Sequence, residues 1–134
     1  MNTAVKTDNI SKTYPGVLAN SNVSITINES SIHAVVGENG AGKSTLMKIL
    51  YGMIKPDSGN IEIFNNTASI SSPKEAINLG IGMVHQHFML AKNLTVLENI
   101  ILGIDRASLK NLGLSKYKKQ IQEVMKTYSL DIDL

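Results

Sequence analysis

A glycine-rich run between an apolar stretch and an amphipathic stretch constrains the fold more than any other feature of the sequence. The run is Gly-Glu-Asn-Gly-Ala-Gly-Lys-Ser-Thr, at residues 37–45. The apolar residues 32–36 before it are typical of a buried strand, and residues 44–50 after it predict a helix. Because strand, glycine-rich turn and helix follow directly, we expect a loop that presents backbone N–H groups at a helix N-terminus.

The residue types of this loop suit a phosphate ligand. Gly37, Gly40 and Gly42 allow positive φ and a close approach of the backbone to an anion. Lys43 supplies a positive charge for the β and γ phosphates, and the Ser44 hydroxyl can bind a Mg²⁺ ion that bridges them. A chance glycine-rich turn is the alternative, which the flanking strand and helix disfavour. The sequence therefore predicts a site for a nucleoside triphosphate with Mg²⁺, formed by Gly37, Glu38, Asn39, Gly40, Ala41, Gly42, Lys43, Ser44 and Thr45.

Composition narrows the class of protein. A chain of 134 residues with 43% hydrophobic residues fits one modest globular domain with a real core. A net charge of +2 is too small to indicate a nucleic-acid partner. No stretch approaches the roughly 18 consecutive apolar residues of a membrane span, and the absence of cysteine excludes a disulfide framework. We therefore expect a location on the cytoplasmic side and no nucleic-acid partner.

Local patterns predict further elements. Apolar residues alternate with polar ones at 23–27 and again at 61–63, after the turn Pro-Asp-Ser-Gly at 56–59, which predicts two strands. Ser72 and Thr95 are each followed three residues later by glutamate, which predicts two capped helices, and Gly80 and Gly103 are expected to end them. A short strand at 81–84 and a last helix, with apolar residues at Tyr117, Ile121, Val124 and Tyr128, complete the expected elements.

Five segments in this order resemble the ATP-binding subunit of an ABC transporter: residues 11–16, 37–45, 56–59, 80–88 and 94–100. The stretch 84–90 is most similar to the branch that drives nucleoside uptake, close to the simple-sugar importers. The resemblance covers about residues 5–133 and implies an α/β fold of the P-loop NTPase class. It implies an antiparallel β subdomain with the start of the RecA-like core and of the helical subdomain. We expect residues 1–134 to be a partial ABC ATP-binding domain, truncated before the signature motif and Walker B.

The resemblance also implies roles for single residues. Tyr14 matches the aromatic residue that stacks on adenine, a contact of about 1–3 kcal/mol per base in comparable cases; an ordinary turn tyrosine before Pro15 is the alternative. Thr45 would lie on the α-phosphate side. Gln86 matches the glutamine that reaches Mg²⁺ and the γ-phosphate, so Ser44 and Gln86 are the expected metal ligands.

Several parts that ATP hydrolysis requires in this family do not follow Gln86 in the sequence. They are the acidic strand end, the adjacent water-polarising glutamate, the switch histidine and a Leu-Ser-Gly-Gly-Gln-like signature. Rate acceleration depends on groups that act on the transition state. We therefore expect binding of Mg-ATP without turnover by this chain alone, and the sequence leaves open whether the chain is an enzyme.

The first functional hypothesis is the ATP-binding component of a transporter that couples ATP binding and hydrolysis to import of a nucleoside or sugar. It implies permease subunits, a second ATP-binding domain and an extracytoplasmic solute-binding protein as partners, with the subunit peripheral on the inner face of the membrane. The alternative is a small, non-catalytic nucleotide-binding regulatory module. The identity of the solute does not follow from this sequence.

Overall fold

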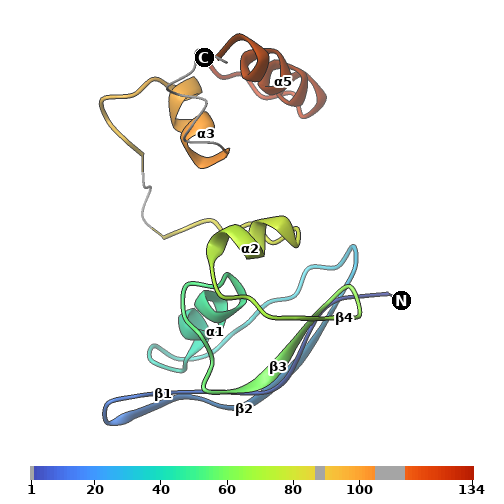
Figure 1. The fold of residues 1–134 in the computed structure, drawn as a ribbon, viewed down its shortest axis with the longest axis vertical. Helices are drawn as coiled ribbons and strands as arrows, with labels where there is room; N and C mark the ends of the chain where they lie inside the picture. The colour runs from blue at the N-terminus through green and yellow to red at the C-terminus, as the bar shows by residue number, and fades with distance from the viewer. Residues whose placement is uncertain (1, 87–89, 105–113) are drawn as a thin grey trace. The chain divides into compact units, whose positions relative to one another are not determined.

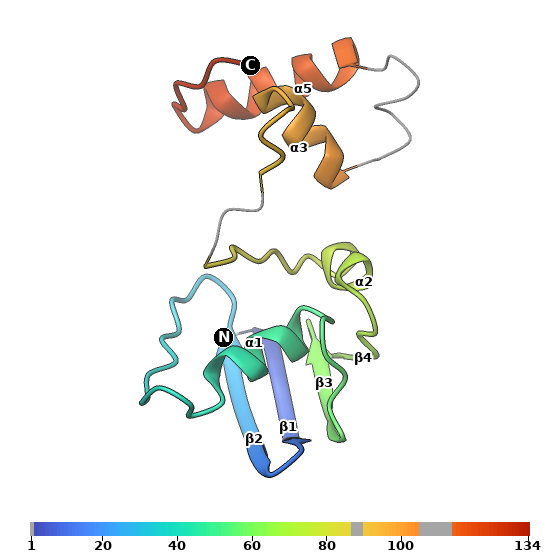
Figure 2. The same cartoon turned by 90° about the vertical axis from the view of Figure 1, so that its left-hand side faces the viewer.

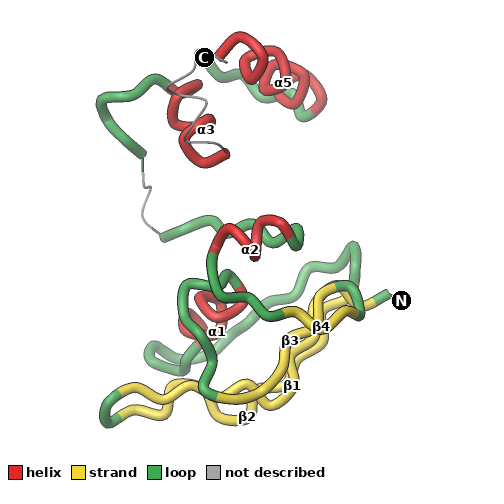
Figure 3. Tube along the Cα trace, viewed as in Figure 1, coloured by secondary structure: helices red, strands yellow, loops and turns green. Residues whose placement is uncertain are grey.

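The computed structural model describes residues 2–86, 90–104 and 114–134. The chain divides into two compact units, Met1–Val84 and His85–Leu134. In the described residues the strands all belong to the first unit, whereas helices occur in both (Figure 3).

The first unit is built on an antiparallel sheet of four strands (Figure 1). These are β1 (Thr3–Tyr14), β2 (Val17–Asn28), β3 (Ser58–Ile63) and β4 (Asn66–Ala68), and their order in the sheet is β2-β1-β3-β4. Both strands predicted from alternation are confirmed, within β2 and β3. An antiparallel sheet with one face packed on the core and the other exposed to solvent produces this alternation of apolar and polar residues.

Helix α1 (Lys43–Leu50) packs on one face of the sheet (Figure 2). Leu46, Ile49 and Leu50 are buried, as expected of residues spaced three and four apart on one helical face. They meet the fully buried Ile10 of β1. Burying such a side chain contributes about 1.5–3 kcal/mol each. The rest of this core consists of Ile61, Ile63, Ile70 and Ala76.

Both predicted helix caps are present. At α2 (Pro73–Asn78), the Glu75 N–H donates to Ser72 Oγ (3.3 Å). The Glu75 carboxylate accepts from the Ser71 N–H at 2.7 Å, one residue earlier than a reciprocal cap predicts. This hydrogen bond is the main cause of a lowered pKa at Glu75. Gly80 follows α2 with φ +86, the conformation that ends a helix.

Helix α3 (Val96–Ile104) carries the complete capping box. The Glu98 N–H donates to Thr95 Oγ1 (3.2 Å), and the Thr95 N–H donates back to Glu98 Oε2 (2.7 Å). The second of these hydrogen bonds is the main cause of a lowered pKa at Glu98. The prediction that Gly103 ends this helix is wrong, since α3 continues to Ile104.

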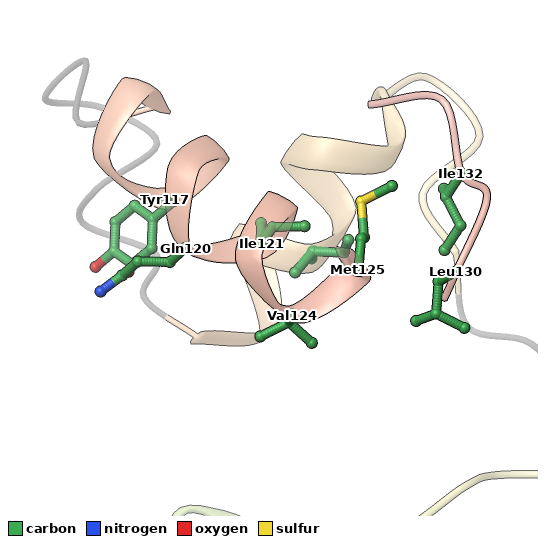
Figure 4. Close-up of a pocket in the computed structure, with 8 residues that line it drawn as sticks. Tyr117, Gln120, Ile121, Val124, Met125, Leu130 and Ile132 are labelled. Atoms are coloured by element: carbon green, nitrogen blue, oxygen red, sulfur yellow. The ribbon is translucent and has the colours of Figure 1, made fainter. Parts of the chain in front are cut away.

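In the second unit, α3 packs beside α5 (Leu114–Thr127). Figure 4 shows the apolar side chains of α5 along a cavity of about 360 Å³. The predicted helical spacing of Tyr117, Ile121 and Val124 is confirmed, because all three line this cavity. Tyr128 lies beyond the end of α5. Among the described residues, no helix combines the length and the apolar character needed to cross a membrane.

Two predicted strands are wrong. Residues 32–36 and 81–84 have no strand structure and pair with no strand among the described residues. Three of their apolar side chains are largely exposed, with an exposed fraction of 102% at Ile32, 89% at Val36 and 92% at Val84. An apolar segment becomes a strand only where neighbours accept its N–H and C=O groups, and the sheet of β1–β4 does not extend to these segments.

Substitution by alanine should lower the unfolding free energy by different amounts at two glycines that have positive φ. Gly59 has φ +96, and an added Cβ would lie 2.6 Å from the carbonyl oxygens of Asp8 and Asn9. Gly16 has φ +78 with nothing within 4 Å of an added Cβ. Gly16→Ala should therefore cost about 1–2 kcal/mol for the left-handed backbone alone. Gly59→Ala should cost about 1–3 kcal/mol more, because the backbone of β1 must move.

Urea denaturation of the two variants measures this difference, and Gly16→Ala serves as the matched control. Equal losses of unfolding free energy would contradict the close contact between β1 and the start of β3.

Candidate nucleotide-binding site

The glycine-rich loop reaches α1 through two left-handed glycines. Gly40 has φ +86 and Gly42 has φ +82, and Gly42 is the N-cap of α1. A Cβ on Gly42 would overlap the carbonyl oxygen of Ala19. The backbone at this point therefore lies directly against β2, which only glycine permits. Gly37 departs from the prediction because its φ is not positive.

Lys43 folds back over the loop that precedes it. Its Nζ donates to the carbonyl oxygens of Gly37 (2.6 Å) and Glu38 (2.7 Å). The Ala41 N–H donates to the Glu38 carbonyl (3.2 Å) and closes the loop. An ammonium has three N–H donors, so two of the three hold the loop and the charge stays beside the glycine backbone. This arrangement gives a positive centre next to a helix N-terminus, which favours an anion.

The first turn of α1 provides the rest of the phosphate surface. The first amides of a helix have no partner within it, and they point outward from the N-terminus. Ser44 is exposed and Thr45 is half-buried in this turn. The loop residues Glu38 and Asn39 are exposed as well, so these parts of the run are accessible to a ligand.

Magnesium fits the donors that this loop offers. The ion prefers oxygen ligands and keeps several waters, binding through few protein groups together with substrate phosphates. The exposed Ser44 hydroxyl is a donor of this kind. In the described part of the chain no group of three or more His, Cys, Asp or Glu residues could hold a metal.

Asn20 supports the loop from β2, a role that no local sequence pattern indicates. The side chain is only 5% exposed, and its Nδ2 donates to the Gly42 carbonyl at 3.3 Å. The same carbonyl accepts the first helical hydrogen bond of α1, from the Leu46 N–H (3.0 Å). Asn20 Oδ1 is buried and has no hydrogen-bond partner. The hydrogen bond from the Asn20 side-chain amide to Gly42 thus fixes the position of the N-terminus of α1 on the sheet.

Tyr14 belongs to the same unit as the loop. It ends β1 and pairs with Val17 across the turn of the β1–β2 hairpin, and its side chain is half-buried. Lys12 pairs with Asn20, the residue that contacts Gly42. The strand β2 therefore connects the turn that carries Tyr14 with the support of the glycine-rich loop.

Gln86 belongs to the second unit, His85–Leu134, where it lies exposed in a bend. Its contact with Mg²⁺ and the γ-phosphate stays a prediction. Residues 87 and 88 of the matching segment lie outside the described residues.

The antiparallel sheet, the glycine-rich loop and α1 are typical of the phosphate-loop NTPase class of fold. Residues 20–133 match the family model described as ABC transporter. The chain therefore belongs to the ABC transporter ATP-binding family.

Two curated relatives are importer subunits. The guanosine import ATP-binding protein NupO of Bacillus subtilis is 44% identical over 124 residues, which cover 92% of this chain and 24% of that protein. The nucleoside import ATP-binding protein NupA of Lactococcus lactis is 44% identical over 131 residues, covering 98% and 26%. Others are named as glucose and arabinose import ATP-binding proteins. The chain thus spans about a quarter of the length of these relatives.

Solved structures agree with the family. The ADP conformation of MJ1267, an ATP-binding cassette of an ABC transporter, has a TM-score of 0.69 at 33% identity, covering 77% of this chain and 41% of that one. A nucleotide-free ATP-binding cassette from an ABC transporter has a TM-score of 0.77 at 26% identity, covering 96% and 55%. The expected fold class, an incomplete ABC nucleotide-binding domain, is confirmed.

Substitutions at Asn20 test the support of the loop. In Asn20→Asp a carboxylate faces the Gly42 carbonyl without a donor, and a buried charge without a partner costs about 3–5 kcal/mol. Asn20→Leu loses one hydrogen bond but also removes the unpartnered Oδ1, so it should cost no more than about 1–2 kcal/mol. Thermal and urea unfolding at neutral pH measure both. Equal stability of wild type and Asn20→Asp would show that Asn20 does not contact Gly42 in solution.

Proposed function

We propose that this chain binds Mg-ATP at residues 37–45 and serves as part of the ATP-binding subunit of an importer. One observation carries the proposal: left-handed Gly40 and Gly42 lead into the N-terminus of α1, while Lys43 lies over the loop. An anion with several oxygens satisfies such a surface. The ADP conformation of the related cassette MJ1267 supports a nucleotide as the ligand.

Each residue has a part in holding the nucleotide. The loop amides and Lys43 bind the β and γ phosphates, which requires the Lys43 ammonium to turn from the Gly37 and Glu38 carbonyls toward phosphate oxygens. The Ser44 hydroxyl and Gln86 hold Mg²⁺, which neutralises charge between the phosphates when bound. Thr45 lies on the α-phosphate side, and Tyr14 stacks on adenine.

The solute that we propose for the transporter is a nucleoside. Two of the relatives are named for guanosine and nucleoside import, each 44% identical to this chain. The sugar importers in the same set range from 36% to 43%. The subunit would work with permease subunits, a second ATP-binding domain and an extracytoplasmic solute-binding protein, at the cytoplasmic face of the membrane.

The proposal assigns binding, not turnover, to these 134 residues. Catalysis of phosphoryl transfer requires groups that position water and stabilise charge in the transition state. Since no Leu-Ser-Gly-Gly-Gln-like segment occurs in the sequence, we expect hydrolysis only when complementary parts of an ATP-binding domain are present.

Lys43→Ala is the decisive variant for this site. In the proposed complex the Lys43 ammonium forms charge-assisted hydrogen bonds to phosphate oxygens, which contribute about 1.5–3 kcal/mol. Without the ammonium, the affinity for Mg-ATP should fall by roughly 10- to 100-fold. The fold should be unchanged, because the hydrogen bonds of the Lys43 ammonium go to carbonyls of its own loop. Isothermal titration calorimetry measures binding, since the chain has no tryptophan to report it.

Lys48→Ala is the matched control, because Lys48 is an exposed lysine in the last turn of the same helix. It should bind as wild type does. If Lys43→Ala and wild type bind Mg-ATP with equal affinity, residues 37–45 are not the binding site.

A further inference from the structure

Asp57 lies in the turn before β3 and forms hydrogen bonds with the end of β1. Its Oδ1 accepts from Lys12 Nζ at 2.6 Å, and its Oδ2 accepts from the Thr13 N–H at 2.7 Å. The Asp57 N–H in turn donates to the Ser11 carbonyl at 2.9 Å. Three consecutive residues of β1, directly before Tyr14, are therefore held by one residue of the turn.

The strand pairing of this part of β1 is irregular. The pairing of β1 with β3 ends at Ser11 and Ser58. On the other side, the pairing with β2 shifts register between Ile10 and Lys12 and again between Lys12 and Thr13. Bulges of this kind bend a strand and redirect its side chains. The Asp57 carboxylate contacts the two residues at the second shift, so it fixes the geometry where the ladder is irregular.

Lys12 lies between this carboxylate and the aromatic ring. Its Nζ is 6.0 Å from the centroid of Tyr14, near the outer limit of a cation–π contact. The side chain of Lys12 is 17% exposed, against 46% for Asp57. The hydrogen bond from Lys12, followed by that from Thr13, lowers the pKa of Asp57 below its ordinary value. The carboxylate is therefore ionised at neutral pH and keeps both contacts.

We propose that Asp57 is a positioning residue for the nucleobase: through Lys12 and Thr13 it holds Tyr14 in the orientation that stacks on adenine. The inference rests on the proposed role of Tyr14 in nucleotide binding. Orienting the ring before binding removes an ordering cost that the ligand otherwise bears. Asp57 therefore increases affinity for the base portion of the nucleotide and leaves the phosphate portion unaffected.

The same two strands provide a matched control. Lys6 of β1 and Glu62 of β3 form an ion pair at 3.1 Å. This pair also joins β1 to the β3 side of the sheet, but it lies eight residues before Tyr14 in the sequence. Loss of an exposed ion pair by itself costs little stability, so Glu62→Gln reports the general effect of such a loss on the sheet.

The test measures binding of two ligands by calorimetry, both with Mg²⁺: ATP, which carries the base, and inorganic tripolyphosphate, which does not. Asp57→Asn should weaken ATP about three- to tenfold, a part of the stacking contribution. Its affinity for tripolyphosphate should stay within about twofold of wild type, which also shows that the variant is folded. Glu62→Gln should match wild type for both ligands.

Combining variants separates positioning from a general loss of structure. Tyr14→Leu should weaken ATP but not tripolyphosphate, and adding Asp57→Asn to it should produce no further loss, because coupled residues are not additive. Additive losses, equal weakening of both ligands, or an Asp57→Asn variant that binds ATP as wild type does would each overturn the inference. If wild type binds ATP no more tightly than tripolyphosphate, the role of Tyr14 and this inference are both overturned, and the phosphate site still stands. Wild type that binds neither ligand would overturn the proposed function itself.

Discussion

The close contact between Gly42 and β2 determines how the first unit is assembled. The helix backbone meets the carbonyl of Ala19 without an intervening side chain, and Asn20 donates to the Gly42 carbonyl from the same strand. Starting from this point, α1 places its apolar face on Ile10 of β1. A larger residue at position 42 would lift the N-terminus of α1 from the sheet and displace the glycine-rich loop as well, since the loop ends where the helix begins.

Elements with local signals could be predicted from the sequence. The caps at Ser72 and Thr95 depend on residues three positions apart, and both form as expected. Two strands, β2 and β3, were visible as alternation, whereas β1 and β4 were not predicted. The apolar spacing of α1 and α5 matched the observed helices. The glycine-rich loop was visible for the same reason, because its residues are adjacent in sequence and act together.

Features that depend on distant partners could not be predicted. The contact of Asn20 with Gly42 spans 22 positions and that of Asp57 with Lys12 spans 45, so no local pattern indicated either. Residues 32–36 showed the opposite error: their composition suits a strand, but a strand also needs neighbours, and the sheet of β1–β4 does not supply them. At Gly37, glycine by itself did not require a positive φ, because the residue type permits that conformation without imposing it.

The β1–β2 hairpin joins the two ends of the proposed nucleotide site. One part of it supports the phosphate loop through Asn20, and the other end carries Tyr14. Between them lies the register shift from Lys12 to Thr13, where the pairing of β1 with β2 is irregular. The distance between the base contact and the phosphate contacts therefore depends on a segment whose pairing with β2 is irregular. A side chain from outside the hairpin, Asp57, contacts this segment at two points. These hydrogen bonds from outside the hairpin help to fix the spacing between the base contact and the phosphate contacts. A site that recognises both ends of one ligand needs this spacing, because a misplaced contact at one end lowers the affinity that the contact at the other end can contribute.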